Sequence, residues 1–262
     1  MLVDLHNHTY KSHDGFSTDK QIISACKKKG INAIAITEHD VPCRSNSKLY
    51  KENNIELIKG CEFTTNNGAH IIGLFISDSN LLDNSREGII KHIKNEGGII
   101  IMPHPWKKDS GYMAKYCEDD FLHNFDFIEM INGGWNSKEF ENDILKIAKK
   151  YDIKMVSSSD SHKCSHIGLC ATRIISCKEF SVGQAKEILR LSKQHDFELL
   201  IDFSSLKLHG RKTLRFQKTN AYQLLLKFVP KLLRRYIKLA KYYISNEKYS
   251  HKADYTIFKL PQ

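Results

Sequence analysis

The sequence lacks any apolar run that approaches the roughly 20 residues of a transmembrane helix. It also lacks the apolar core of a signal peptide, because Asp4, His6 and His8 fall where that core would lie. Its seven cysteines are scattered, odd in number and without a Cys-x-x-Cys pair. That distribution is typical of reduced thiols and not of a disulfide framework. We therefore expect a cytoplasmic protein.

Acidic residues are scarce towards the carboxyl-terminal end. Residues 205–262 contain fourteen Lys and Arg against Glu247 and Asp254, a local charge of +12. Because the whole chain carries +10, residues 1–204 carry about −2. This asymmetry predicts two regions, a domain over residues 1–204 and a basic helical extension over residues 205–262.

The basic extension contains an amphipathic pattern over residues 225–244. Leucine, valine and tyrosine recur there with a period of 3.6 residues, and six Lys and Arg occupy the opposite face. The favoured interpretation is a helix that packs on the first domain with a solvated basic face. Alternatives are peripheral contact of residues 219–245 with an anionic membrane and contact with nucleic acid. Nucleic acid ranks last, because no nucleic-acid-binding motif accompanies the charges.

Short apolar runs alternate with helical patterns through the first 200 residues. Several runs are rich in Ile and Val and apolar on both faces, as in strands covered on both sides. Thr18, Ser85 and Asn136 are predicted N-caps of the helices between them. The alternation predicts an α/β fold with a parallel sheet, either closed into a barrel or open. The predicted strands are 2–5, 33–37, 56–59, 70–76, 99–102, 125–131, 154–158 and 171–176.

Histidines and carboxylates gather at the carboxyl ends of these predicted strands. In α/β barrels that edge is where active sites are built. The residues that directly follow strands are His6, His8, Glu38, His39, Glu62, His104, Asp160 and His162. Nearly every predicted strand in the first 160 residues thus ends in a potential ligand, which is difficult to explain by chance.

Single members of this set have ordinary alternatives. His6 and His8 point the same way in extended backbone, although a lone His-x-His is more often a polar turn. Asp14 precedes Gly15, which is also typical of a turn. His39 could be a core histidine, and Glu62 a surface carboxylate. His104 is more informative, because the prolines on both sides restrict its backbone.

The donor mixture points to a catalytic rather than a structural metal site. Histidines and carboxylates without cysteine disfavour a structural zinc site with thiolate ligands. They suit two or three borderline cations, an arrangement that can clamp a phosphoryl group.

Five motifs resemble the PHP (polymerase and histidinol phosphatase) family. They are DLHNHTYKSHDG (4–15), AITEHD (35–40), GCEFTTNNGAHIIG (60–73), MPHPW (102–106) and SSSDSH (157–162), in order over about residues 1–176. The segment 128–136 departs from the family pattern, so Asn132 is only a secondary candidate for the site. The resemblance implies a distorted (β/α)7 barrel that binds two or three divalent ions (Mn, Fe or Zn). The ligands that it implies are His6, His8, Asp14, His39, Glu62, His70, His104, Asp160 and His162.

The resemblance and the ligand chemistry together imply hydrolysis of a phosphate ester through a metal-bridged hydroxide. We expect Asp160, His162 and His39 to be catalytic and the substrate to be a small phosphorylated molecule or a phosphoprotein. Arg44, Lys107 and Arg173 are candidates for binding the substrate phosphate, with ordinary surface charge as the alternative. Two rival functions are a metal-dependent amidohydrolase and a non-catalytic scaffold that uses its basic tail.

Overall fold

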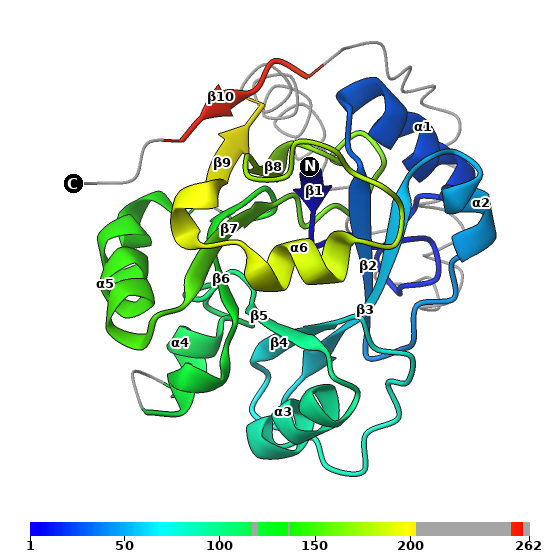
Figure 1. The fold of residues 1–262 in the computed structure, drawn as a ribbon. Helices are drawn as coiled ribbons and strands as arrows, with labels where there is room; N and C mark the ends of the chain where they lie inside the picture. Colours follow the sequence, from blue (N-terminus) through cyan, green and yellow to red (C-terminus); the bar gives the residue numbers. More distant parts are fainter. Residues whose placement is uncertain (117–119, 136, 203–252, 259–262) are drawn as a thin grey trace, which may run out of the picture.

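A single curled sheet forms the centre of the molecule in the computed structural model, which describes residues 1–116, 120–135, 137–202 and 253–258 (Figure 1). The strand order is β10-β9-β8-β1-β2-β3-β4-β5-β6-β7. The strands are β1 (Leu2–Asp4), β2 (Ala33–His39), β3 (Glu56–Thr64), β4 (His70–Leu74), β5 (Ile99–Met102), β6 (Phe127–Asn132), β7 (Lys154–Ser158), β8 (Cys170–Ile174), β9 (Phe197–Ile201) and β10 (Thr256–Ile257).

The sheet is mixed, so the expectation of a wholly parallel sheet was wrong. β1, β2 and β3 are parallel, as are β5, β6 and β7. β4 runs antiparallel to both β3 and β5, and β8 and β9 are also antiparallel to their neighbours. Only residues 65–69 join β3 to β4, and a parallel connection needs a crossover of a dozen residues or more. A hairpin is therefore the connection that this loop length permits.

Hydrogen bonds that involve side chains connect β7, at one end of the sheet, with β8 and β9 near the other end. The Ser157 amide of β7 donates to the Thr172 hydroxyl of β8 at 2.9 Å. The Ser157 hydroxyl donates to the Leu200 carbonyl of β9 at 3.1 Å, and the Ser159 hydroxyl to the Cys170 carbonyl at 2.9 Å. These bonds curl the sheet into a barrel-like shape without a complete ring of backbone hydrogen bonds. The α/β class is confirmed. The described residues form ten strands, whereas the sequence pattern predicted eight and the family resemblance implied seven.

Helices surround the curled sheet. They are α1 (Asp19–Lys29), α2 (Ser47–Lys51), α3 (Arg86–Asn95), α4 (Tyr112–Tyr116), α5 (Glu141–Tyr151) and α6 (Ala185–Leu191). Thr18 and Ser85 cap α1 and α3 as predicted, and α1 ends at Gly30 in the left-handed conformation. α5 begins only at Glu141, after a short 3-10 helix. The expected cap Asn136 lies outside the described residues.

Helix α6 covers the amino-terminal end of the barrel. Ala185 and Leu189 of α6 pack into the apolar cluster inside the barrel. Glu56, the first residue of β3, accepts from the Ala185 amide at 3.0 Å. Lys154, the first residue of β7, donates to the Leu189 carbonyl at 2.9 Å. With one end covered, access to the interior is left to the carboxyl ends of β1, β2, β5 and β7.

Part of the expected extension returns to the sheet. Thr256 and Ile257 of β10 pair with β9, and Tyr255 packs against the apolar cluster beneath α1. The predicted helix over residues 225–244 lies outside the described residues. Among the described residues, no helix is both long and apolar enough to cross a membrane.

Candidate metal centre

His6 and His8 leave the carboxyl end of β1 and are both buried. The intervening Asn7 pairs with Ser161 as an isolated parallel bridge, and the His8 amide donates to the Ser161 carbonyl at 2.8 Å. This short bridge ties the turn after β1 to the turn after β7. The Nε2 atoms of His6 and His8 are consequently 3.2 Å apart, which fits the extended geometry expected of a His-x-His pair.

Glu62 is the carboxylate around which the histidines gather. It lies within β3, which extends to Thr64, and so it does not follow the strand as predicted. Its Oε2 is 3.1 Å from His6 Nε2 and 3.2 Å from His39 Nδ1. Its Oε1 is 2.6 Å from His70 Nδ1 and 3.0 Å from His104 Nε2. One buried carboxylate thus connects ligands from four other segments of the chain.

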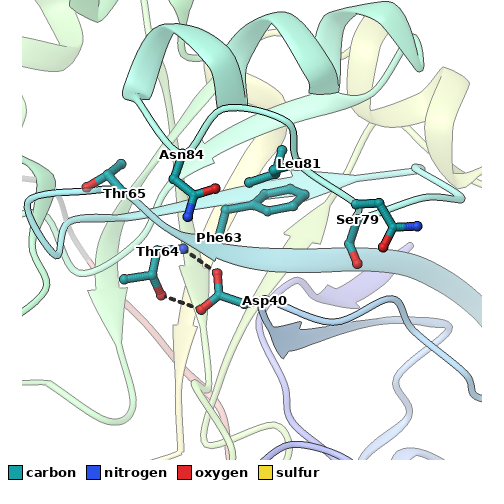
Figure 2. Close-up of a pocket in the computed structure, with 8 residues that line it drawn as sticks. Asp40, Phe63, Thr64, Thr65, Ser79, Leu81 and Asn84 are labelled. Atoms are coloured by element: carbon teal, nitrogen blue, oxygen red, sulfur yellow. Dashed lines mark hydrogen bonds between the residues drawn. The ribbon is translucent and has the colours of Figure 1, made fainter.

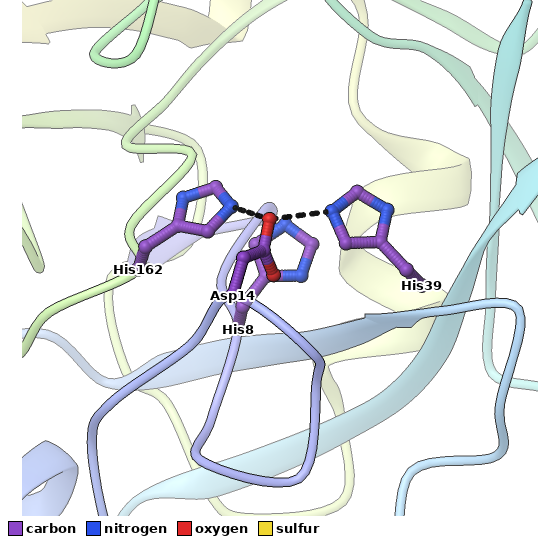
Figure 3. A group of neighbouring side chains, drawn as sticks. All are labelled: His8, Asp14, His39 and His162. Carbon is purple, nitrogen blue, oxygen red and sulfur yellow. Dashed lines mark ion pairs between the residues drawn. The ribbon is translucent and has the colours of Figure 1, made fainter. Parts of the chain in front are cut away.

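Asp14 lies between His39 and His162 at the mouth of the site (Figure 3). Its Oδ2 is 2.9 Å from His162 Nε2 and 3.2 Å from His39 Nε2. The ring of His8 stacks on both of these histidines. The loop after β1 therefore brings a carboxylate back over the histidines, as the family resemblance implied.

Asp160 completes the opposite side of the cluster. Its Oδ1 is 3.5 Å from His6 Nε2 and 3.6 Å from His8 Nε2. Asp160 and His104, together with Asp40, adopt positive φ angles of 47°, 29° and 52°. Non-glycine residues rarely adopt this conformation, and it concentrates at functional sites. Here it bends the chain sharply at three strand ends.

The charges of this cluster are strongly coupled. Burial by itself lowers the pKa of His6, but Asp160, Glu62 and Glu129 outweigh burial and raise that pKa well above its ordinary value. Burial by itself raises the pKa of Asp160, but His6, His8 and His104 hold it well below its ordinary value. The carboxylates are therefore ionised in a buried setting, which requires positive charge beside them.

The residues fit a group of divalent cations. Among the described residues, four sets of His, Asp and Glu side chains have ligand atoms that lie within 4.8 Å of one another inside each set. His6, His8, His39 and Glu62 each belong to two of these sets. The buried Nδ1 atoms of His8 and His104 have no hydrogen-bond partner among the described residues. A cavity of about 400 Å³ above them is lined by five carboxylates, and Lys107 is the only Lys or Arg among its described lining residues. Imidazoles and carboxylates without thiolate are the ligands that Mn, Fe and Zn bind.

All nine ligands expected from the sequence meet at this centre, whereas the three phosphate-binding candidates separate. Lys107 lines the cavity, with its Nζ 3.8 Å from Asp160 Oδ2. Arg44 does not line it. Arg173 pairs with Glu198 at 3.0 Å and lies opposite Leu2, at the far end of β1. The prediction assumed that β8 is parallel to β1. Because β8 is antiparallel to β1, Arg173 lies away from the site.

Glu129 is a site residue that the sequence reasoning missed. It is fully buried in β6, and its Oε1 accepts from His6 Nδ1 at 3.0 Å. Its Oε2 accepts from the His104 amide at 2.8 Å and from Asn132 Nδ2 at 2.6 Å. Asn132, the secondary candidate, thus reaches the site through Glu129. An acidic residue inside an apolar strand was the available signal, because buried carboxylates are almost always paired.

Replacing Glu129 with Gln is expected to weaken metal binding tenfold to a hundredfold, on the order found for such outer carboxylates. The Glu129 carboxylate accepts hydrogen bonds on both of its oxygens. The glutamine amide has only one oxygen, so its NH₂ group would face a donor, either that of His6 or those of His104 and Asn132. Titration of Mn²⁺ into the metal-free variant measures the effect. Glu139→Gln, at an exposed position, is the matched control and should bind as the unaltered protein does. Equal affinities for both variants would contradict the prediction.

The fold and the site together define a barrel-like α/β protein with a cluster of potential metal ligands at the carboxyl ends of its strands. A model of the PHP domain matches residues 4–251, so this chain belongs to the PHP family. Over 81% of the chain it is 30% identical to an uncharacterized Methanocaldococcus jannaschii protein, covering 88% of that protein. Over 80% of the chain it is 26% identical to a Caldicellulosiruptor saccharolyticus protein named a probable phosphatase, covering 97% of it.

A solved structure supports the fold. A two-domain Bacteroides vulgatus protein that contains a predicted PHP-like metal-dependent phosphoesterase superposes with a TM-score of 0.59 at 21% identity. The match covers 76% of this chain, which spans 64% of the length of that protein.

Proposed function

We propose that this protein is a metal-dependent phosphoesterase that hydrolyses a small phosphorylated substrate. The observation that carries the proposal is the cavity at the metal centre, which five carboxylates and five histidines line and in which Lys107 is the only Lys or Arg among the described lining residues. Such a cavity repels a phosphate unless cations are bound, and with cations it becomes a clamp for a phosphoryl group. Membership of the PHP family and the relative named a probable phosphatase support the same reaction.

The proposed cofactor is two or three divalent ions, with Mn, Fe or Zn as the candidates. The four overlapping sets of ligand atoms support more than one ion. When bound, such ions lower the pKa of water and neutralise charge on phosphoryl oxygens. His6, His8, Glu62 and their neighbours hold these ions, and Glu129 fixes the orientation of His6 through a 3.0 Å hydrogen bond.

The remaining residues of the cavity orient the substrate and move protons. Lys107 is half exposed at the rim and can donate to a phosphoryl oxygen. In this proposal Asp160 accepts the proton of the attacking water. His162 and His39, which both contact Asp14, flank the same space. In-line attack requires the leaving group to point away from the nucleophile.

A substrate panel tests the proposal. The metal-loaded protein is expected to hydrolyse an aryl phosphate such as p-nitrophenyl phosphate, while aryl amides and cyclic amides of similar size are left intact. Turnover of amides alone would favour the amidohydrolase alternative, since related sites use the same cations for both reactions. Bound metal without turnover of any ester or amide would favour a scaffold.

A further inference from the structure

A second cavity of about 520 Å³ lies directly beside the metal centre. Asp40 and Thr64 line both cavities and form the wall between them. A phosphate held at the metals would therefore have this second space next to it. Its volume falls within the range that accommodates small-molecule ligands.

The shared wall is rigidly built. Asp40 accepts from the Thr64 amide at 2.7 Å and from the Thr64 hydroxyl at 2.8 Å (Figure 2). Each carboxylate oxygen accepts one of these bonds, and an ionised carboxylate has about four acceptor positions. Asp40 is exposed and can therefore accept further hydrogen bonds from a ligand.

The other walls combine hydrogen-bonding groups with apolar surface. Asn84 extends from the loop before α3 towards Asp40 and Thr64 (Figure 2). Neither the Asn84 amide group nor the Ser79 hydroxyl has a side-chain hydrogen bond within the described part of the chain. Leu81 supplies an apolar side of the same cavity, and it packs against the core cluster that contains the fully buried Phe63.

No Lys, Arg or His lines this cavity among the described residues, and its only charged side chain is Asp40. A second phosphate or a carboxylate on the substrate would face Asp40 without a compensating cation. A flat aryl group offers no hydrogen-bonding group to Asp40, Asn84 or the buried Ser79. A polar group that is buried without a partner costs about 1–3 kcal/mol. A group with several hydroxyls and an apolar carbon face satisfies both kinds of wall.

We infer that this cavity is the leaving-group subsite and that it selects an uncharged polyhydroxylated group, such as the hexose of a sugar monophosphate. The inference rests on the phosphoesterase function proposed above. Asp40 accepts from sugar hydroxyls, Asn84 and Ser79 donate to or accept from others, and Leu81 contacts the carbon face.

Asn84→Ala tests the subsite, with Asn66→Ala as the control in the neighbouring loop. Asn66 is exposed and does not line the cavity. With glucose 6-phosphate, Asn84→Ala should lower kcat/KM about threefold to tenfold, the size of one lost neutral hydrogen bond. With p-nitrophenyl phosphate, which lacks hydroxyls on its leaving group, both variants should match the unaltered protein. The unaltered protein should also prefer glucose 6-phosphate to glucose 1,6-bisphosphate.

The outcomes separate the subsite from the reaction. Hydrolysis of p-nitrophenyl phosphate with no selective loss on glucose 6-phosphate in Asn84→Ala would overturn the subsite and leave the phosphoesterase function standing. A preference for the bisphosphate would overturn it as well. If no phosphate ester is hydrolysed, calorimetry of glucose 6-phosphate binding to the Mn²⁺-loaded protein tests the subsite instead. Weaker binding to Asn84→Ala than to Asn66→Ala would support the subsite, and equal or absent binding would refute it.

Discussion

Removal of divalent cations is expected to abolish hydrolysis of p-nitrophenyl phosphate, with a loss of at least about a thousandfold. Metal ions contribute several kcal/mol of charge stabilisation to such reactions, and each 1.36 kcal/mol corresponds to a tenfold change in rate. In this protein the loss also includes binding, because five carboxylates line the cavity and Lys107 is the only Lys or Arg among its described lining residues. The measurement is kcat/KM after dialysis against a chelator, followed by stepwise addition of Mn²⁺, Fe²⁺ or Zn²⁺.

Thermal unfolding provides a readout that does not depend on turnover. Ligands that bind only the folded state stabilise it, and Glu62 and Asp160 are ionised and almost completely buried. The metal-free protein should therefore unfold at a lower temperature, and the metal that restores activity should restore the midpoint. A chelator saturated with Mn²⁺ beforehand is the control for direct chelator effects. Full activity after stringent metal removal would refute the metal-dependent reaction.

Among single substitutions that preserve the shape of the side chain, Glu62→Gln should reduce activity the most. The Glu62 carboxylate lies within 3.3 Å of ring nitrogens of five histidines, namely His6, His8, His39, His70 and His104. Glutamine removes the negative charge and replaces one acceptor oxygen with a donor. We expect kcat to fall at least about a thousandfold, as for loss of several kcal/mol of metal-derived stabilisation.

Metal content shows whether the Glu62→Gln effect arises at the centre. The variant should bind fewer ions for each chain, measured by elemental analysis after gel filtration. Glu52→Gln, at an exposed position at the end of α2, is the control and should keep both activity and metal content. A Glu62→Gln variant with normal metal content and more than a tenth of the activity would contradict the central role assigned to this carboxylate.

The ligands could be predicted because they are local to strand ends. His6 and His8 follow one apolar run, and Asp160 and His162 follow another, so each pair has a fixed geometry whatever the remainder of the fold. Carboxyl ends of parallel strands meet at one edge, and this rule brought together residues separated by more than 150 positions. His104 was found for a related reason, because its two flanking prolines restrict its backbone.

Other features depend on which strands become neighbours. Glu129 orients His6 across 123 residues of sequence, and no local pattern specifies that pairing. Arg173 was misplaced because the direction of β8 follows from its pairing with β1 and not from its composition. The cavity beside Asp40 combines the end of β2, the strand β3 and the loop before α3, which become adjacent only when the sheet curls.

The sequence by itself therefore determined the α/β class, the positions of eight of the ten described strands, the caps Thr18 and Ser85, and the ring of histidines and carboxylates. These follow from short-range rules: the period of apolar residues, the preferences of cap residues and the backbone geometry of a strand. Tertiary structure decided strand direction, the carboxylate that supports the ligands and the shape of the space beside them. Those properties arise from contacts between distant segments, whose geometry is fixed only once the whole sheet is packed.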